Sequence, residues 1–118
     1  MLDKDTIAQL IADIGEDVFL RLSKQFLEET EHRLAALKAA WQSAAWADLA
    51  RHAHSLKSTA QSFGLTETGI QARELQLAAD HLDLDAVKTA LPKLLAITAT
   101  ECADFQRMRE ELESHGNR

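Results

Sequence analysis

The sequence has few of the residues that break helices or cross-link chains. It contains one cysteine, one proline, four glycines and no tyrosine among 118 residues. A single cysteine excludes an intrachain disulfide, which fits a reducing compartment. No apolar run approaches the roughly 20 residues needed to span a membrane, and the early acidic residues argue against a signal peptide. We therefore expect a cytoplasmic protein that has no contact with the membrane.

An excess of positive charge is also lacking, since the formal net charge is −6. An acidic chain does not offer the broad basic surface that neutralises nucleic-acid phosphates, so we do not expect nucleic acid as a partner. The length suits one modest core and one domain over residues 1–118. We expect the tail, residues 114–118, to be frayed.

What the sequence does have is helical patterning. Hydrophobic residues make up 46% of the chain, and most of them are alanine and leucine, which favour helix. Periodicity predicts a short helix from an Asp3 or Asp5 cap to Gly15, and further helices over about 17–42 and 45–63. Thr66 is the expected cap of a fourth helix and Asp83 of a fifth. Pro92 should kink or split the fifth helix near Ala90. The apolar positions expected inside these helices are Ile7, Leu10, Ile11, Ile14, Phe19, Leu22, Phe26, Leu34, Leu37, Trp41, Ile70, Leu75, Ala79, Leu84, Val87, Leu91, Leu94, Leu95, Ile97, Phe105, Met108 and Leu112.

The predicted fold class is all-α. No strand pattern, repeat or low-complexity segment is evident. Short loops between long amphipathic helices make neighbouring helices antiparallel, so we expect an up-and-down antiparallel four-helix bundle. The short N-terminal helix would cap one end of that bundle.

One face of the third predicted helix carries polar residues that suit chemistry. The apolar residues Leu49, Ala53, Leu56, Ala60 and Phe63 form one continuous stripe at helical spacing. At about 100° per residue, a different face receives His54, Lys57, Ser58 and Gln61. His54 is therefore predicted to be exposed, with Lys57 and Ser58 one turn away. A lone exposed histidine is also compatible with a plain solvated side chain.

The surroundings of His54 are free of acidic residues. None occurs between Asp48 and Glu67, whereas Arg51, His52, His54 and Lys57 all lie within this stretch. In an acidic chain this is a local positive field, which favours an anion. An exposed neutral imidazole offers a nucleophilic nitrogen, and a neighbouring lysine can neutralise phosphoryl oxygens.

The segment Ala53–Gly64, with the sequence AHSLKSTAQSFG, resembles the signature of histidine phosphotransfer (HPt) domains, A-H-x-L-K-G followed by a second glycine. Helix order and the place of the motif agree with that family over nearly the whole chain. The resemblance implies a phosphorelay intermediate in a two-component system, with His54 as phosphoacceptor and Lys57 steadying the phosphoryl group. It also implies a carrier without kinase activity of its own.

The same resemblance implies the partners and the supporting residues. The partners would be receiver domains of response regulators, whose aspartate donates or accepts the group, and a hybrid sensor kinase upstream. The receiver brings Mg²⁺, so no metal or other cofactor is expected on this chain, which would act as a monomer. Small and apolar residues near His54 on the second and third helices would form the docking surface. Supporting residues would be Ser58, Gln61, Arg51 and Gly64.

The chain departs from the family pattern at two positions. Ser58 replaces the first glycine of the motif. In the family that glycine leaves room beside the histidine for the receiver to approach. The hydroxyl of Ser58 could touch the phosphoryl group, and the choice of partner or the rate of transfer could differ from the family. Gln76 stands where many relatives have glutamate, and we attach no functional consequence to it from sequence alone.

Two other functions remain open at this stage. A purely structural helical adaptor would bind its partner without any phosphohistidine. A dimerisation and phosphoacceptor region of a sensor kinase is disfavoured, because Ser55 follows the histidine where that class needs an acidic residue. That class would also be an obligate dimer, and no Gly-rich nucleotide motif occurs here.

The remaining polar and aromatic residues have structural interpretations. His52 is expected to flank the core, and its two-residue spacing from His54 disfavours a shared metal. Cys102 is interpreted as a small core residue, and Trp41 and Trp46 as packing anchors. His32, His81 and His115 are expected to be solvated. The charge run from Arg107 to Glu113 is interpreted as a solvated helical face.

Overall fold

The protein folds into five helices, as the computed structural model describes for residues 1–116. Within these residues no strand forms, and the β-type pairing is one isolated bridge between Leu2 and Leu65. The all-α prediction is therefore confirmed. The helices are α1 (Lys4–Ile14), α2 (Glu16–Gln42), α3 (Trp46–Ser62), α4 (Thr66–Asp80) and α5 (Leu84–Gly116).

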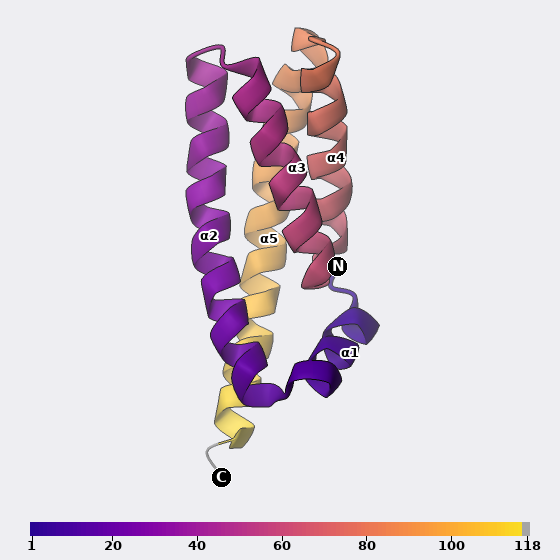
Figure 1. The fold of residues 1–118 in the computed structure, drawn as a ribbon, viewed down its shortest axis with the longest axis vertical. Helices are drawn as coiled ribbons and strands as arrows, with labels where there is room; N and C mark the ends of the chain where they lie inside the picture. Colours follow the sequence, from indigo (N-terminus) through magenta and orange to yellow (C-terminus); the bar gives the residue numbers. More distant parts are fainter. Residues whose placement is uncertain (117–118) are drawn as a thin grey trace.

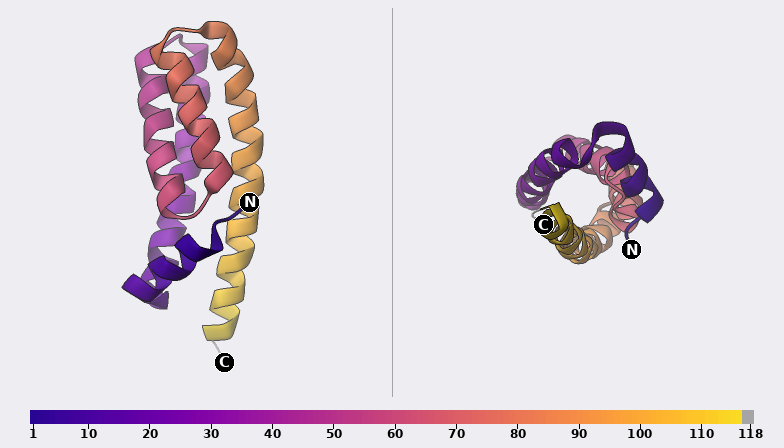
Figure 2. Two further views of the ribbon diagram at one scale, coloured as in Figure 1. Left: turned by 90° about the vertical axis from the view of Figure 1, so that its right-hand side faces the viewer. Right: turned by 90° about the horizontal axis from the view of Figure 1, so that it is seen from below.

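The four longer helices lie side by side along a molecule with extents of 51 × 22 × 20 Å (Figure 1). Consecutive helices alternate in direction because the connections between them are short. Helices α2 and α5 are the longest, and α1 lies across the molecule at the end away from the α2–α3 turn (Figure 2). No helix within residues 1–116 has the length and apolar character needed to cross a membrane.

Several helix ends follow the expected capping chemistry. Asp3 caps α1 by accepting a hydrogen bond from the Thr6 backbone at 3.2 Å, and Asp83 accepts from the Ala86 backbone at 3.2 Å at the start of α5. The prediction for Thr66 was wrong, because Thr66 is already the first residue of α4 and Leu65 precedes it without a side-chain cap.

The structure excludes one of the two predicted effects of Pro92, a split of the fifth helix. Helix α5 runs unbroken through Pro92 to Gly116, so residues 114–116 of the expected frayed tail are helical; residues 117–118 lie outside the described part. Proline removes the hydrogen bond to the carbonyl four residues earlier. Here that residue, Lys88, is exposed like Pro92, so water can satisfy the free carbonyl.

Two hydrophobic clusters fill the interior. One lies toward the α2–α3 turn and contains Leu37, Leu49, Ala53, Leu56, Ala72, Leu75, Val87 and Leu94. The other lies toward α1 and contains Ile7, Phe19, Phe26, Ala60, Leu65 and Phe105. Phe26 stacks on Phe63 with centroids 4.4 Å apart. Three residues expected inside are exposed: Leu22 (39%), Ile70 (47%) and Leu84 (45%). Leu22 and Leu84 lie at the edges of the apolar stripes of their helices, whereas Ile70 lies on the face of α4 opposite its buried residues and lines an open groove between α4 and α5.

Two charged side chains of α5 are buried, and both make hydrogen bonds that the sequence pattern does not predict. Glu101 accepts bonds from the backbone N–H groups of Glu67 (3.2 Å) and Thr68 (2.6 Å). Its carboxylate therefore caps the N-terminus of α4 in place of Thr66. Arg109 is only 5% exposed. It donates to the Ser23 hydroxyl at 2.8 Å and to the Leu20 carbonyl at 2.9 Å.

The burial of Arg109 contradicts the interpretation of Arg107–Glu113 as a solvated face. Its neighbours in that run, Arg107 and Glu110, are exposed as expected. Other packing predictions agree with the structure. Trp41 and Trp46 lie against each other across the α2–α3 turn, with centroids 5.6 Å apart. Cys102 is partly buried beside the second cluster, and burial raises the pKa of its thiol to about 11.

Candidate functional site

His54 lies on α3 with its imidazole exposed, as the sequence predicted. Four of the five residues in the stripe that fixes this orientation are fully buried: Leu49, Ala53, Leu56 and Ala60 each have 0% exposure. Since α3 buries these four residues against the other helices, its opposite side must face solvent. The histidine therefore lies on a rigid helix, where a partner molecule can reach it.

The imidazole of His54 is held by Gln76 of α4. Its Nδ1 lies 3.2 Å from the side-chain oxygen of Gln76. An amide oxygen only accepts hydrogen bonds, so Nδ1 carries the proton and donates it. In the neutral ring the other nitrogen, Nε2, then has a free lone pair. The bond leaves the outer nitrogen available as the nucleophile.

Gln76 is the functional residue that sequence analysis missed. Its departure from the family pattern was visible, but no consequence was attached to it. The side chain is half-buried between α3 and α4 and is positioned to orient the ring. The role of glutamine at this position can be recognised only when it is known which residue of α4 faces His54.

Lys57 and Ser58 lie one turn along α3 from His54, as expected. Lys57 is half-buried, and it forms no ion pair with any residue in the described chain. Ser58 is exposed, but its hydroxyl donates to the backbone carbonyl of His54 at 3.3 Å. The hydroxyl is thus turned back onto its own helix.

The other predicted supporting residues are Arg51, Gln61 and Gly64, and each lies in different surroundings. Arg51 is exposed, and Asp48 holds its guanidinium at 2.8 Å. Gln61 is exposed and lies against α4. Gly64 is buried, and its carbonyl accepts a bond from the Asp3 backbone at 2.7 Å. The structure therefore places Gly64 under the start of α1 and away from His54.

His52 faces α2 and is half-buried, in agreement with the expectation that it flanks the core. Its Nδ1 lies 3.1 Å from a guanidinium nitrogen of Arg33. Arginine only donates, so this Nδ1 is unprotonated. Burial lowers the pKa of His52 below its usual value, and the positive charges of Arg33 and Arg51 lower it further. His52 and His54 thus have different partners on different helices.

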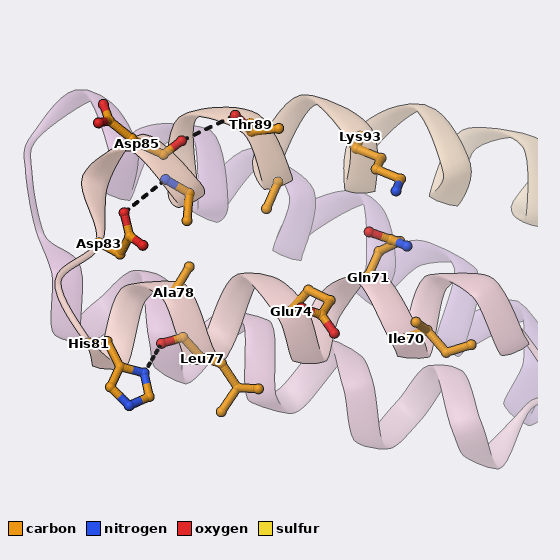
Figure 3. Close-up of a pocket in the computed structure, with 12 residues that line it drawn as sticks. Ile70, Gln71, Glu74, Leu77, Ala78, His81, Asp83, Asp85, Thr89 and Lys93 are labelled. Carbon is orange, nitrogen blue, oxygen red and sulfur yellow. Dashed lines mark hydrogen bonds between the residues drawn. The ribbon is translucent and has the colours of Figure 1, made fainter.

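A metal centre has no support among residues 1–116, where no group of three or more His, Cys, Asp or Glu side chains could hold an ion. An open groove does lie between α4 and α5 (Figure 3). Two of its polar groups serve helix ends: Asp83 caps α5, and His81 Nδ1 donates to the Leu77 carbonyl at 2.7 Å. His54 is not among the residues that line this groove.

Taken together, the site is an exposed helical histidine with an oriented ring, a free outer nitrogen and a half-buried lysine one turn away. Such an arrangement can accept a phosphoryl group, because phosphoryl transfer depends mainly on positioning and on charge compensation.

Comparison with known proteins identifies a class of protein that agrees with this site. Residues 21–115 match the family described as "Hpt domain". The chain therefore belongs to the histidine phosphotransfer domain family, and it is a phosphotransfer intermediate of phosphorelay signalling. Members of this family are phosphocarriers that interact with receiver domains and kinases.

A solved structure supports the assignment over almost the full length. The chain is similar to the crystal structure of histidine-containing phosphotransfer protein B (HptB) from Pseudomonas aeruginosa PAO1, with a TM-score of 0.88 and 25% sequence identity. The match covers 93% of this chain and 95% of that chain. No curated protein matched the sequence.

Proposed function

We propose that His54 is the phosphoacceptor of this carrier, and that it exchanges the phosphoryl group with receiver-domain aspartates of response regulators and of a hybrid sensor kinase. The observation that carries this proposal is the bond from His54 Nδ1 to Gln76, which leaves Nε2 free at an exposed position beside Lys57.

In the proposed transfer, the lone pair of His54 Nε2 attacks the phosphorus of a receiver's aspartyl phosphate. The N–P bond forms as the P–O bond to the aspartate breaks, and the aspartate leaves as a carboxylate. Nδ1 keeps its proton and its bond to Gln76, while Lys57 compensates charge on the phosphoryl oxygens. The reverse sequence returns the group to another receiver. In this proposal the receiver supplies the Mg²⁺ that the transfer needs.

The fold supports this role. We interpret α2–α5 as an up-and-down four-helix bundle that α1 caps at one end, and residues 1–118 as a single domain. In this interpretation the helices act as a rigid support that presents one histidine, with no kinase activity of their own. We further propose that the carrier is a cytoplasmic monomer, and that its docking surface lies on α2 and α3 around His54.

The test uses a purified receiver carrying a phosphorylated aspartate. His54→Gln should fold normally and take no acid-labile label, whereas His32→Gln, which alters an exposed histidine of α2, should be labelled like the unmodified protein. Label that persists on His54→Gln would disprove the assignment. If no label appears on any variant while the receiver still binds equally with or without its aspartate, the chain is an adaptor.

A further inference from the structure

Helices α3 and α4 are packed antiparallel in a defined register. Near the middle of the seam, His54 contacts Gln76. Seven residues further along α3, Gln61 lies against Gly69, which is seven residues earlier in α4: a Cβ added at Gly69 would lie 3.1 Å from Cγ of Gln61. The two contacts therefore fix the level of every residue between them.

This register places Arg73 beside Lys57. Arg73 precedes Gln76 by three residues in α4, and Lys57 follows His54 by three residues in α3. Since the helices run in opposite directions, both cations lie one turn from the imidazole, on the same side of it. Around the axis of α4, Arg73 is about 60° from Gln76. Its side chain is exposed, so it lies at the outer edge of the α3–α4 seam.

Neither cation is neutralised. Within residues 1–116, Arg73 and Lys57 have no carboxylate within ion-pair distance, whereas Arg51 on the other side of His54 is held by Asp48. The acidic residue next to Arg73 in the sequence, Glu74, lines the groove between α4 and α5 (Figure 3). At about 100° per residue, it lies about 160° around α4 from Gln76, the residue that contacts His54. Two free positive charges thus remain on one side of the histidine.

We propose that Arg73 is the second cation of the site and that it donates hydrogen bonds to the phosphoryl group carried by His54. This inference rests on the proposed function of His54. A phosphoryl group on nitrogen has three oxygens and close to two negative charges, more than one lysine compensates. A guanidinium can bind two of these oxygens through its planar fork, and Lys57 adds a point charge from α3. The phosphoryl group would then be held from both helices.

The experiment measures the equilibrium between a phosphorylated receiver and the carrier, together with the affinity of the unphosphorylated receiver. Arg73→Gln should lower the ratio of phosphorylated carrier to phosphorylated receiver by about three- to tenfold, the usual effect of one exposed charge-assisted hydrogen bond. Arg73→Lys should recover part of the loss, since it keeps the charge but not the fork. Affinity for the unphosphorylated receiver should stay within about twofold.

Arg21→Gln is the matched control, because it removes the same charge from an exposed position near the start of α2, far along the sequence from His54. It should leave the equilibrium unchanged. An Arg73→Gln equilibrium equal to that of Arg21→Gln would overturn the proposal. So would an equal loss of affinity for the unphosphorylated receiver, which would make Arg73 a docking residue. His54→Gln, run in parallel, separates this failure from a failure of His54 as the acceptor.

Discussion

The side-chain oxygen of Gln76 on α4 lies 3.2 Å from Nδ1 of His54 on α3, and this contact determines which ring nitrogen faces solvent. Two helices thus contribute to the state of one imidazole: α3 carries the ring, and the Gln76 oxygen on α4 favours the tautomer with the proton on Nδ1. The same contact marks the seam along which Lys57 and Arg73 lie.

Replacing Gln76 should affect chemistry more than folding. Gln76→Leu removes the acceptor for Nδ1–H, and we expect the rate of transfer from a phosphorylated receiver to fall about three- to tenfold, the effect of one net hydrogen bond. Gln76→Glu keeps an acceptor and should stay close to the unmodified rate. Nitrogen chemical shifts of the His54 ring report the tautomer. Unchanged shifts and rate in Gln76→Leu would show that Gln76 does not orient the ring.

The stability of the protein should depend on pH through His52. The pKa of His52 is lowered from 6.5 in the folded state by burial and by Arg33 and Arg51. As the pH falls below 6.5, His52 is protonated in the unfolded chain before it is protonated in the folded protein. The contribution of neutral His52 to the free energy of unfolding is therefore fully present above pH 6.5, and it is lost as the pH falls toward the folded pKa.

Urea unfolding at about pH 7.5 and about pH 5.5 measures this loss, and His52→Gln should show a smaller one. His32→Gln, an exposed histidine of α2, is the control and should keep the pH dependence of the unmodified protein. Identical pH dependence in all three proteins would contradict the assignment to His52.

The buried Arg109 should contribute strongly to stability. Arg109→Met removes the buried guanidinium and its bonds to the Ser23 hydroxyl and the Leu20 carbonyl, and we expect a loss of about 2–4 kcal/mol in the free energy of unfolding. Arg107→Met removes the same charge from an exposed position two residues away, where the expected change is within about 0.5 kcal/mol. Similar losses in the two variants, measured by urea unfolding, would refute a specific role for Arg109.

Gly64 should matter for folding and not for transfer. Its φ is +81°, and a Cβ there would lie 2.9 Å from the Asp3 carbonyl oxygen. Gly64→Ala is expected to lose about 2–4 kcal/mol, from the left-handed backbone and from displacement of α1. At low temperature, the folded variant should still accept label at the unmodified rate. Slower phosphoryl transfer by fully folded Gly64→Ala would show that this glycine contributes to the functional site.

Much of the site was predictable because it depends on the spacing within one helix. The apolar stripe of α3 is a property of residues three and four apart, so the exposure of His54 and the nearness of Lys57 follow without knowledge of any other helix. The structure gives two of the predicted supporting residues other partners. Arg51 and Gly64 belong to the right stretch of sequence, but Asp48 engages one and α1 covers the other.

The buried charges of α5 could not be foreseen for a related reason. Arg109 lies in a run of charged residues, and its local pattern is that of a solvent-exposed face. Its burial depends on Ser23 and Leu20 of α2, more than eighty residues away. Glu101 likewise caps α4 from a different helix.

The sequence by itself determined the helices, their apolar faces and the exposed histidine, because these depend on local hydrogen bonding and on the helical repeat. The tertiary structure alone decided which residue of α4 meets His54. That pairing depends on the register between two helices, which is set by close approach at Gly69 and by packing of the whole core. The periodicity of apolar residues predicts which face of each helix is buried, but it does not predict the register in which two helices pack along their axes.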